Sequence, residues 1–522
     1  MRFAVIALAA CAALAAIPAL AAAATITVNT TFDTAPALGE CQGGAPSDCS
    51  LRQAIDVANG TEGPDTIVLP AGHYLLTIKG DEEDENQTGD LDLTNKGEVT
   101  IAGAGARTTV IDAAGLEDRV IDIQPGAALS LAKATVTGGD VSDENGGGIR
   151  AGEVVLTLNQ VSVRGNVSRN SGRGGGIAAL NSQTTIAASL IAENRNSGDG
   201  GGLWLEDGET SLVNTTIAYN VVDTSLYPSQ PTWGAYGGGM EVDGGHLAMQ
   251  NVTITGNSVA DNNGGEDGLG AGIEGEPLTA AIVNTIVYGN TATNADSPRQ
   301  CTSVLLSEGH NLEQQPPAGE KRCFEAPTDL IADPLFGPLA NNGGETDTVA
   351  LSTGSAAIDT GDLTRCPATD QRGLLRPQFG GCDIGAFEVQ PPPPPPPPAQ
   401  PTIKRRGKVK VKKAGKTFLV KPGFRVSCPA GGEKCTGSIK ARAPKPKAKK
   451  KVLIGKAKFT VAPGKTKVLK LKLNSRGAEM LRELEKLRTR FDVRARAGAG
   501  AVVKAKATLK VKLPAGLRKG SR

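Results

Sequence analysis

The chain has 522 residues, and only 3% of them are aromatic, which suits a thin core of small aliphatic side chains. The net charge of +2 hides two opposite parts: residues 401–522 hold 38 of the 56 Lys and Arg but only 5 of the 54 Asp and Glu, which leaves residues 1–400 with 18 basic and 49 acidic residues. Such asymmetry indicates separate domains with different partners, or domains that are partners of each other. Beyond the amino terminus, no apolar run reaches the roughly 18 residues that a membrane helix needs, so we expect no transmembrane segment.

Residues 1–24 have the pattern of a secretory signal peptide. Arg2 precedes an apolar, Ala-rich run through Leu20, and small residues follow to Ala24. The stretch that ends in Cys11 also resembles a bacterial lipobox, in which Cys11 would carry lipid, but few apolar residues precede it and the apolar run continues past it. We therefore expect an exported protein, secreted or held at the cell surface.

A short helix is predicted at residues 49–59, before the first repeats. Leu51, Ala54, Ile55 and Ala58 follow helical spacing, and Ser50 with Gln53 forms a capping box. A helix at this place suits the open end of a repetitive β structure, which must be covered to prevent further strand pairing.

Internal repeats dominate the region that follows. A glycine-rich corner and a closing Asn each occur five times, and the last Gly of a corner precedes its Asn by the same interval in every copy: Gly148 and Asn166, Gly176 and Asn194, Gly202 and Asn220, Gly239 and Asn257, Gly272 and Asn290. The interval from each Asn to the next corner is not constant. A constant part with one variable corner is typical of a solenoid coil. Residues 25–390 are therefore predicted to form an all-β, right-handed parallel β-helix.

Two columns of side chains should stack along this solenoid. Three positions before each Asn stands a β-branched residue, as inward-facing stacked strands require: Val163, Ile191, Ile217, Ile254 and Val287. The Asn column is expected to form a ladder of stacked carboxamides.

The eight cysteines that remain after signal cleavage fall into four local pairs. An even number in an exported chain favours disulfides between close neighbours. The predicted bridges are Cys41–Cys49, Cys301–Cys323, Cys366–Cys382 and Cys428–Cys435.

Short motifs in five stretches carry two family resemblances. The sequence Cys49-Ser50-Leu51-Arg52-Gln53-Ala54-Ile55 resembles the motif of bacterial CSLREA-domain proteins, with Gln53 in place of the usual Glu. Residues 332–344, 355–359, 370–373 and 382–388 are similar to the choice-of-anchor Q domain. The resemblance implies a pectin-lyase-like β-helix on an exported protein that is fixed to the cell by a C-terminal anchor. It defines no catalytic residues.

Candidate ligand-binding residues follow from the strand register after each glycine corner. The first residue after the corner should point inward, and the second and fourth should point outward. Carboxylates from adjacent coils then gather on one outward face, with Trp204 at its edge: Glu206, Glu241, Asp243, Glu274 and Glu276. This set could bind Ca²⁺, supply an acid–base pair for glycoside hydrolysis, or form a solvated acidic face. A calcium nonapeptide motif is missing, and the second and fourth positions of these coils contain no Lys, Arg or His.

Insertions at the variable corner provide a second set of candidates. The loop 221–236 carries Tyr227, Trp233 and Tyr236, and aromatic side chains on a loop suit stacking on sugar rings. The alternative is that they cover the side of the solenoid. The acidic loop 258–269 could bind a cation, although a flexible polar loop is the preferred interpretation, and the acidic run 81–85 is predicted to be a solvated excursion.

The C-terminal part reads as a separate domain after a proline-rich linker, residues 391–400. Residues 401–522 contain several alternating strands and resemble a small immunoglobulin-like β-sandwich, with one helix expected around residues 476–490. Their basic excess suits an anionic cell-envelope polymer. The domain has no Trp or Tyr, so we expect no nucleic-acid binding through base stacking.

The preferred functional prediction is an exported, monomeric, non-enzymatic surface or matrix protein that binds polysaccharide or a cell-envelope polymer. It requires no cofactor, with calcium as the one candidate ion. The alternative is a carbohydrate-active enzyme, a polysaccharide lyase or a glycoside hydrolase, that uses the outward carboxylates.

Overall fold

The computed structural model describes residues 23–36, 41, 48–61, 63–80, 83–94, 97–226, 235–260, 270–292, 299–392, 399–430, 432–445 and 450–518. The chain divides between Pro391 and Pro392 into two compact units, each of which is described by itself. The predicted signal peptide and the proline run lie almost wholly outside the described residues. Among the helices of the described ranges, none is long and apolar enough to cross a membrane.

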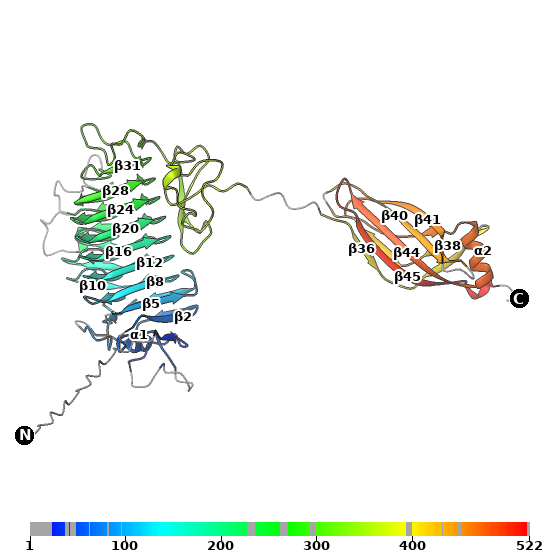
Figure 1. Cartoon of the computed structure of the whole chain (residues 1–522), viewed down its shortest axis with the longest axis horizontal. Coiled ribbons are helices and arrows are strands. Elements are labelled where there is room, and N and C mark those ends of the chain that lie inside the picture. Colours follow the sequence, from blue (N-terminus) through cyan, green and yellow to red (C-terminus); the bar gives the residue numbers. More distant parts are fainter. Residues whose placement is uncertain are drawn as a thin grey trace, which may run out of the picture. The chain divides into compact units, whose positions relative to one another are not determined.

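The first unit is a stack of coils built from four parallel sheets (Figure 1). Sheet A contains β1 (Thr25–Thr27), β2 (Asp65–Leu69), β5 (Glu98–Gly103), β8 (Ala128–Ala132), β12 (Val155–Asn159), β16 (Gln183–Ala187), β20 (Glu209–Val213), β24 (His246–Gln250), β28 (Thr279–Val283) and β31 (Ser307–Gly309). Sheet B contains β3 (Gly72–Leu75), β6 (Thr109–Asp112), β9 (Thr135–Thr137), β13 (Ser162–Arg164), β17 (Leu190–Ala192), β21 (Thr216–Ala218), β25 (Thr253–Thr255), β29 (Ile286–Tyr288), β32 (Leu312–Glu313) and β33 (Leu330–Ile331).

Two shorter sheets complete the coils. Sheet C contains β4 (Leu91–Leu93), β7 (Ile121–Ile123), β11 (Ile149–Gly152), β15 (Ile177–Leu180), β19 (Leu203–Glu206), β23 (Met240–Asp243) and β27 (Ile273–Glu276). Sheet D contains β10 (Asp140–Ser142), β14 (Val167–Arg169), β18 (Arg195–Asn196), β22 (Val221–Asp223), β26 (Ser258–Ala260) and β30 (Thr291–Ala292). A short 3₁₀ helix, Thr224–Leu226, follows β22. Every strand in these sheets pairs with the equivalent strand of the next coil, so the predicted parallel β-helix is confirmed.

Both predicted columns are confirmed. The β-branched residues of sheet B pair in register from Val163 to Val287 and are fully buried. The Asn side chains form a continuous buried ladder, in which each Nδ2 donates to the Oδ1 of the Asn in the next coil at 2.9–3.0 Å, from Asn166 through Asn290. Each Nδ2 also donates to a backbone carbonyl of sheet B, for example Asn220 to Ile191 O. The ladder thus satisfies the backbone at the corner between sheets B and D.

The amino-terminal end of the solenoid is covered as predicted. Helix α1 (Leu51–Asn59) begins with the Ser50–Gln53 capping box, and its apolar residues belong to the solenoid core. The four predicted cysteine pairs all form disulfides.

After the last coil the chain returns along the outside of sheet B. This return segment, residues 336–389, begins with an antiparallel hairpin, β34 (Phe336–Ala340) and β35 (Thr348–Leu351), and contains the 3₁₀ helix Leu363–Arg365. Its apolar side chains, among them Ile384 and Phe387, pack on Ile286 and Leu312 of sheet B. Hydrogen bonds extend back to the early coils, where Arg107 pairs with Asp347 at 2.7 Å. The stretches similar to the choice-of-anchor Q domain lie largely in this segment, and the resemblance itself stays a prediction.

The second unit is antiparallel throughout. Two three-stranded sheets contain β36 (Thr402–Arg405), β39 (Phe424–Ser427) and β42 (Thr466–Val468), and β37 (Lys410–Ala414), β38 (Thr417–Lys421) and β43 (Leu471–Lys472). A four-stranded sheet, here called the basic sheet, has the order β41 (Lys451–Val461), β40 (Cys435–Pro444), β44 (Lys486–Ala497) and β45 (Val503–Lys512). The sheets enclose one apolar core, in agreement with the predicted β-sandwich.

The helix in this unit is shorter than predicted. Helix α2 (Ser475–Leu484) ends where Glu485 adopts a left-handed backbone conformation, and residues 486–490 belong to β44 instead. Strand β44 alternates buried residues such as Leu487, Phe491 and Val493 with polar residues, and it pairs with both β40 and β45. The prediction of helix to residue 490 was wrong because this pairing outweighs local helix propensity. A 3₁₀ helix, Ala515–Leu517, follows β45.

Candidate functional site

The strands of sheet C present one outward column of side chains. Its members occupy the second position of each strand and pair in register: Asp92, Asp122, Arg150, Ala178, Trp204, Glu241 and Glu274. The first residue of each strand, for example Ile149 or Leu203, is fully buried, as predicted for the inward position. Because side chains alternate in direction along a strand, the side chains of this column point outward from the solenoid.

The middle of this column is covered. Trp204 is 3% exposed and Glu241 is 8% exposed. The guanidinium of Arg173 lies over the indole ring of Trp204, 5.0 Å from its centroid. A side chain from the preceding coil therefore covers the indole ring, and carbohydrate binding by Trp204 stays a prediction. Of the loop aromatics, Tyr227 and Trp233 lie outside the described residues, and Tyr236 is half-buried.

Five side chains form what we call the carboxyl cluster: Arg173, Asp199, Trp204, Glu241 and Glu274. Arg173 and Asp199 come from the glycine corners, where each directly precedes the first Gly, and their side chains pair with Nε–Oδ2 at 3.3 Å. Sequence reasoning missed both residues because it considered only positions after the corner. The signal was present, since the residue before each corner is itself a repeated position.

Burial sets the electrostatics of this cluster. Removal from water, followed by the nearby carboxyls of Asp199 and Glu274, raises the pKa of Glu241 to about 9 against the opposing effect of Arg173. Burial and acidic neighbours likewise raise the pKa of Glu274 to about 7. Burial raises the pKa of Asp199 to about 6, although Arg173 and the backbone amide of Tyr236 oppose this shift. At neutral pH the Glu241 side chain is therefore a neutral acid next to a guanidinium.

Three buried polar atoms of the carboxyl cluster have no hydrogen-bond partner among the described residues: Asp199 Oδ1, Trp204 Nε1 and Glu241 Oε2. Buried polar groups normally have partners, so three unpartnered atoms within one cluster indicate a site for a polar ligand. A protonated carboxyl and an indole N–H donate hydrogen bonds, whereas Arg173 offers a positive charge. This combination can bind hydroxyl groups or a carboxylate.

The fourth positions of sheet C form a second acidic column. Glu206, Asp243 and Glu276 pair in register on adjacent coils, and the latter two are exposed. Within the described ranges, the one group of three acidic side chains with oxygens within 4.8 Å of one another lies elsewhere. Calcium binding by Glu206, Glu241, Asp243, Glu274 and Glu276 stays a prediction.

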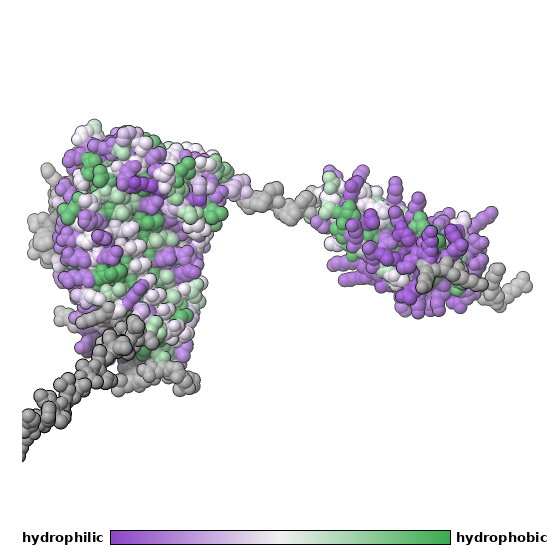
Figure 2. All heavy atoms as spheres, in the orientation of Figure 1, coloured by the Kyte–Doolittle hydropathy of each residue, from purple (hydrophilic) through white to green (hydrophobic). Residues whose placement is uncertain are grey.

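The outer face of the basic sheet is the second candidate surface. Its basic residues alternate with apolar residues that face the core. They are Lys451, Lys456 and Lys458 on β41, Lys440 and Arg442 on β40, Lys486, Arg488, Arg490, Arg494 and Arg496 on β44, and Lys504, Lys506, Lys510 and Lys512 on β45. Figure 2 shows the dense hydrophilic side chains of this unit.

Strand pairing aligns these charges into rows across the basic sheet. Arg494 pairs with Lys504, Arg488 with Lys510, and Lys486 with Lys512. Asp492 is the acidic residue within the rows, and it is held by Arg442 at 3.0 Å and Arg490 at 3.2 Å. Neighbouring strands lie about 4.8 Å apart. The face is therefore a dense array of like charges with little internal compensation.

Comparison with known proteins supports the fold. The family model described as "Right handed beta helix region" matches residues 120–298, a range that contains the carboxyl cluster. No curated protein matches the sequence significantly. The match agrees with the predicted handedness and specifies neither a ligand nor an activity.

Proposed function

We propose that this protein is an exported, non-enzymatic surface or matrix protein that binds polysaccharide or an anionic cell-envelope polymer. In this proposal the basic C-terminal unit binds the cell-envelope polymer and thereby presents the β-helix at the cell surface. The observation that carries the proposal is the in-register array of Lys and Arg on the basic sheet. Like charges this close repel one another, and an anionic partner relieves that repulsion.

The array favours a polymer over a small anion. Each exposed ion pair contributes little in water, so useful affinity requires many simultaneous contacts. A flat sheet with charges on four adjacent strands offers such contacts to an extended polyanion. Nucleic acid fits less well, because the four Phe residues of this unit are buried in its core and leave no aromatic ring for base stacking: Phe418, Phe424, Phe459 and Phe491.

The β-helix supplies a more selective surface. The carboxyl cluster combines a neutral acid, Glu241, with Arg173 and with buried polar atoms that lack partners. Such groups fix the orientation of hydroxyl and carboxylate groups on a sugar. We infer that this cluster contributes to saccharide binding.

One observation favours the enzymatic alternative. No basic residue occurs among the outward positions of the acidic coils, which disfavours catalysis. Arg173 reaches the cluster from a different position, next to a carboxyl that is protonated at neutral pH. A glycoside hydrolase combines a proton donor with an ionised carboxylate, and a lyase combines a base with a cation that neutralises the uronate, so the cluster offers part of either set. Cleavage must therefore be tested together with binding.

The basic sheet is tested by charge reversal. A variant with Lys504→Glu, Lys506→Glu and Lys510→Glu on β45 should bind an anionic polysaccharide panel at least about tenfold more weakly than wild type at physiological salt, which corresponds to about 1.4 kcal/mol. Wild-type binding should weaken steeply as ionic strength rises.

The matched control changes the same number of charges elsewhere in the unit. Lys410, Lys413 and Lys465 are exposed and lie outside the basic sheet, so their reversal to Glu should lower the affinity much less. Equal loss in both variants would show that only net charge matters, and no binding by wild type at low salt would reject the proposal. The same samples should be assayed for new reducing ends and unsaturated uronides. Cleavage that Glu241→Gln abolishes would establish the enzymatic alternative.

A further inference from the structure

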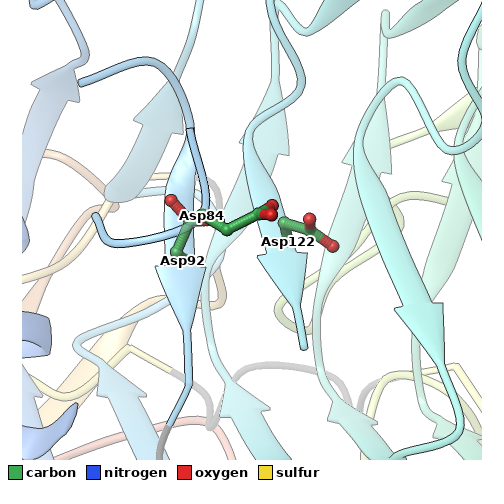
Figure 3. A group of neighbouring side chains, drawn as sticks. All are labelled: Asp84, Asp92 and Asp122. Atoms are coloured by element: carbon green, nitrogen blue, oxygen red, sulfur yellow. The ribbon is translucent and has the colours of Figure 1, made fainter. Parts of the chain in front are cut away.

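A second acidic cluster lies at the amino-terminal end of sheet C. Asp92 on β4 and Asp122 on β7 pair in register, and Asp84 approaches them from the excursion between β3 and β4 (Figure 3). Each of the three offers one carboxylate oxygen, and these oxygens lie within 4.8 Å of one another. The acidic run 81–85 was predicted to be a solvated excursion. Asp84 and Glu85 are exposed, and Glu83 and Asp84 also line a cavity of about 220 Å³.

Hydrogen bonds hold the excursion against the coils. The backbone amide of Asn86 donates to Asp92 Oδ2 at 3.0 Å. Gln124 Nε2 donates to Asp84 Oδ1 at 2.8 Å and to Asp122 Oδ2 at 3.0 Å, and so links the excursion to β7. Arg52 of helix α1 donates to the carbonyl oxygens of residues 88–90. The three carboxylates are therefore positioned by the fold.

Two oxygens at this place are buried without a partner. Asp92 and Asn86 are both fully buried, and neither Asp92 Oδ1 nor Asn86 Oδ1 has a hydrogen-bond partner among the described residues. The orientation of the Asn86 amide is determined by its Nδ2, which donates to Arg52 O at 2.9 Å. A carboxylate oxygen and a carboxamide oxygen that lack donors are suitable ligands for a hard cation.

The local charge is strongly negative. Seven carboxyls lie in or around the cavity: Glu83, Asp84, Asp90, Asp92, Asp118, Asp122 and Glu144. Arg119 and Arg150 are the guanidiniums beside them. Both pair with Asp122, and Arg119 also pairs with Asp90 and Glu144. Among the described residues, no Lys or Arg pairs with Asp84 or Asp92, so these two carboxylates have no counter-charge in contact.

We propose that Asp84, Asp92 and Asp122 bind one calcium ion, with the side-chain oxygen of Asn86 as a candidate fourth ligand. The donors are all oxygens, which excludes a typical zinc site. Ca²⁺ accepts irregular oxygen shells, whereas Mg²⁺ demands near-octahedral geometry and retains its waters. The ion would tie the excursion to the first coils and so stabilise the end of the solenoid that α1 covers.

The test uses the full chain after removal of divalent ions. Isothermal titration should show one calcium site, and calcium should raise the melting temperature of the β-helix more than magnesium does at equal concentration. Asp92→Asn and Asp84→Asn should each abolish both effects. Asp84 is exposed, so Asp84→Asn should fold normally even where the buried change at Asp92 does not.

The matched control is Glu274→Gln in the carboxyl cluster, which should leave calcium binding and the calcium-dependent shift in melting temperature unchanged. Loss of calcium binding in Glu274→Gln with retention in Asp84→Asn would place the ion on the other acidic cluster and overturn the proposal. Melting that does not respond to calcium in the wild-type protein would overturn it as well. Neither result depends on whether the basic sheet binds a polymer.

Discussion

Replacement of Glu241 by Gln should stabilise the β-helix, and the gain should grow with pH. Burial raises the pKa of this carboxyl from 4.5 to about 9. The folded state therefore holds a proton that the unfolded state releases above pH 4.5. The stability that this proton contributes is complete below pH 4.5 and is lost progressively as the pH rises towards 9. Gln has nearly the shape of the protonated acid and has no proton to lose.

The size of the gain in unfolding free energy follows from the shift in the pKa of Glu241. One pKa unit corresponds to about 1.36 kcal/mol, so Glu241→Gln should be about 3 kcal/mol more stable than wild type at pH 7 and within about 1 kcal/mol of it at pH 5. The side chain is only 8% exposed, so solvent screening reduces this value little.

Urea unfolding, followed by far-ultraviolet circular dichroism at pH 5, 6, 7 and 8, measures the difference directly. Glu209→Gln is the control, because Glu209 is an exposed carboxyl on β20 of sheet A, and its replacement should show no comparable trend. A difference between Glu241→Gln and wild type that stays constant over this pH range would refute the reasoning. It would mean that Glu241 is ionised in the folded protein and compensated by a bound group.

Three further predictions concern the fold. Asn220→Ala should destabilise the solenoid by about 3 kcal/mol or more in a urea titration, because it leaves several buried groups of the ladder without partners. Asn159→Ala, at an exposed position, should have little effect in the same titration. Ile217→Asp should unfold the solenoid, since an unpaired buried carboxylate costs several kcal/mol, and an unchanged melting temperature would disprove the column assignment. Phe387→Ala should loosen the return segment, with cleavage within residues 336–389 in limited proteolysis before the coils are cut, and simultaneous cleavage of both would contradict this.

Regular features of the solenoid could be predicted because they depend on short-range spacing. The constant interval between each glycine corner and its Asn specifies the register of every coil. From that register alone follow the buried column that contains Ile217, the ladder that contains Asn220, and the outward direction of Glu241. The cap helix and the disulfides were equally accessible, because a capping box and a local cysteine pair each involve residues close in the chain.

The two candidate sites of the β-helix depend on contacts between residues that the repeat spacing in the sequence does not predict. Arg173 covers Trp204 and pairs with Asp199. Both charged residues stand at the end of the interval between an Asn and the next glycine corner, and the length of that interval varies between repeats. The return segment brings Asp347 to Arg107, which lies far earlier in the chain. Asp84 reaches Asp92 and Asp122 only through the hydrogen bonds of an irregular excursion.

The sequence by itself therefore determined which residues stack from coil to coil, because the parallel pairing repeats one short-range pattern. Only the tertiary structure decided which of the outward-facing side chains are withdrawn from water. That burial depends on corners and excursions whose lengths vary along the chain, and it is burial that raises the pKa of Glu241 and leaves Asp92 Oδ1 without a partner. The repeat placed the carboxylates in columns, and the covering segments made part of those columns into candidate binding sites.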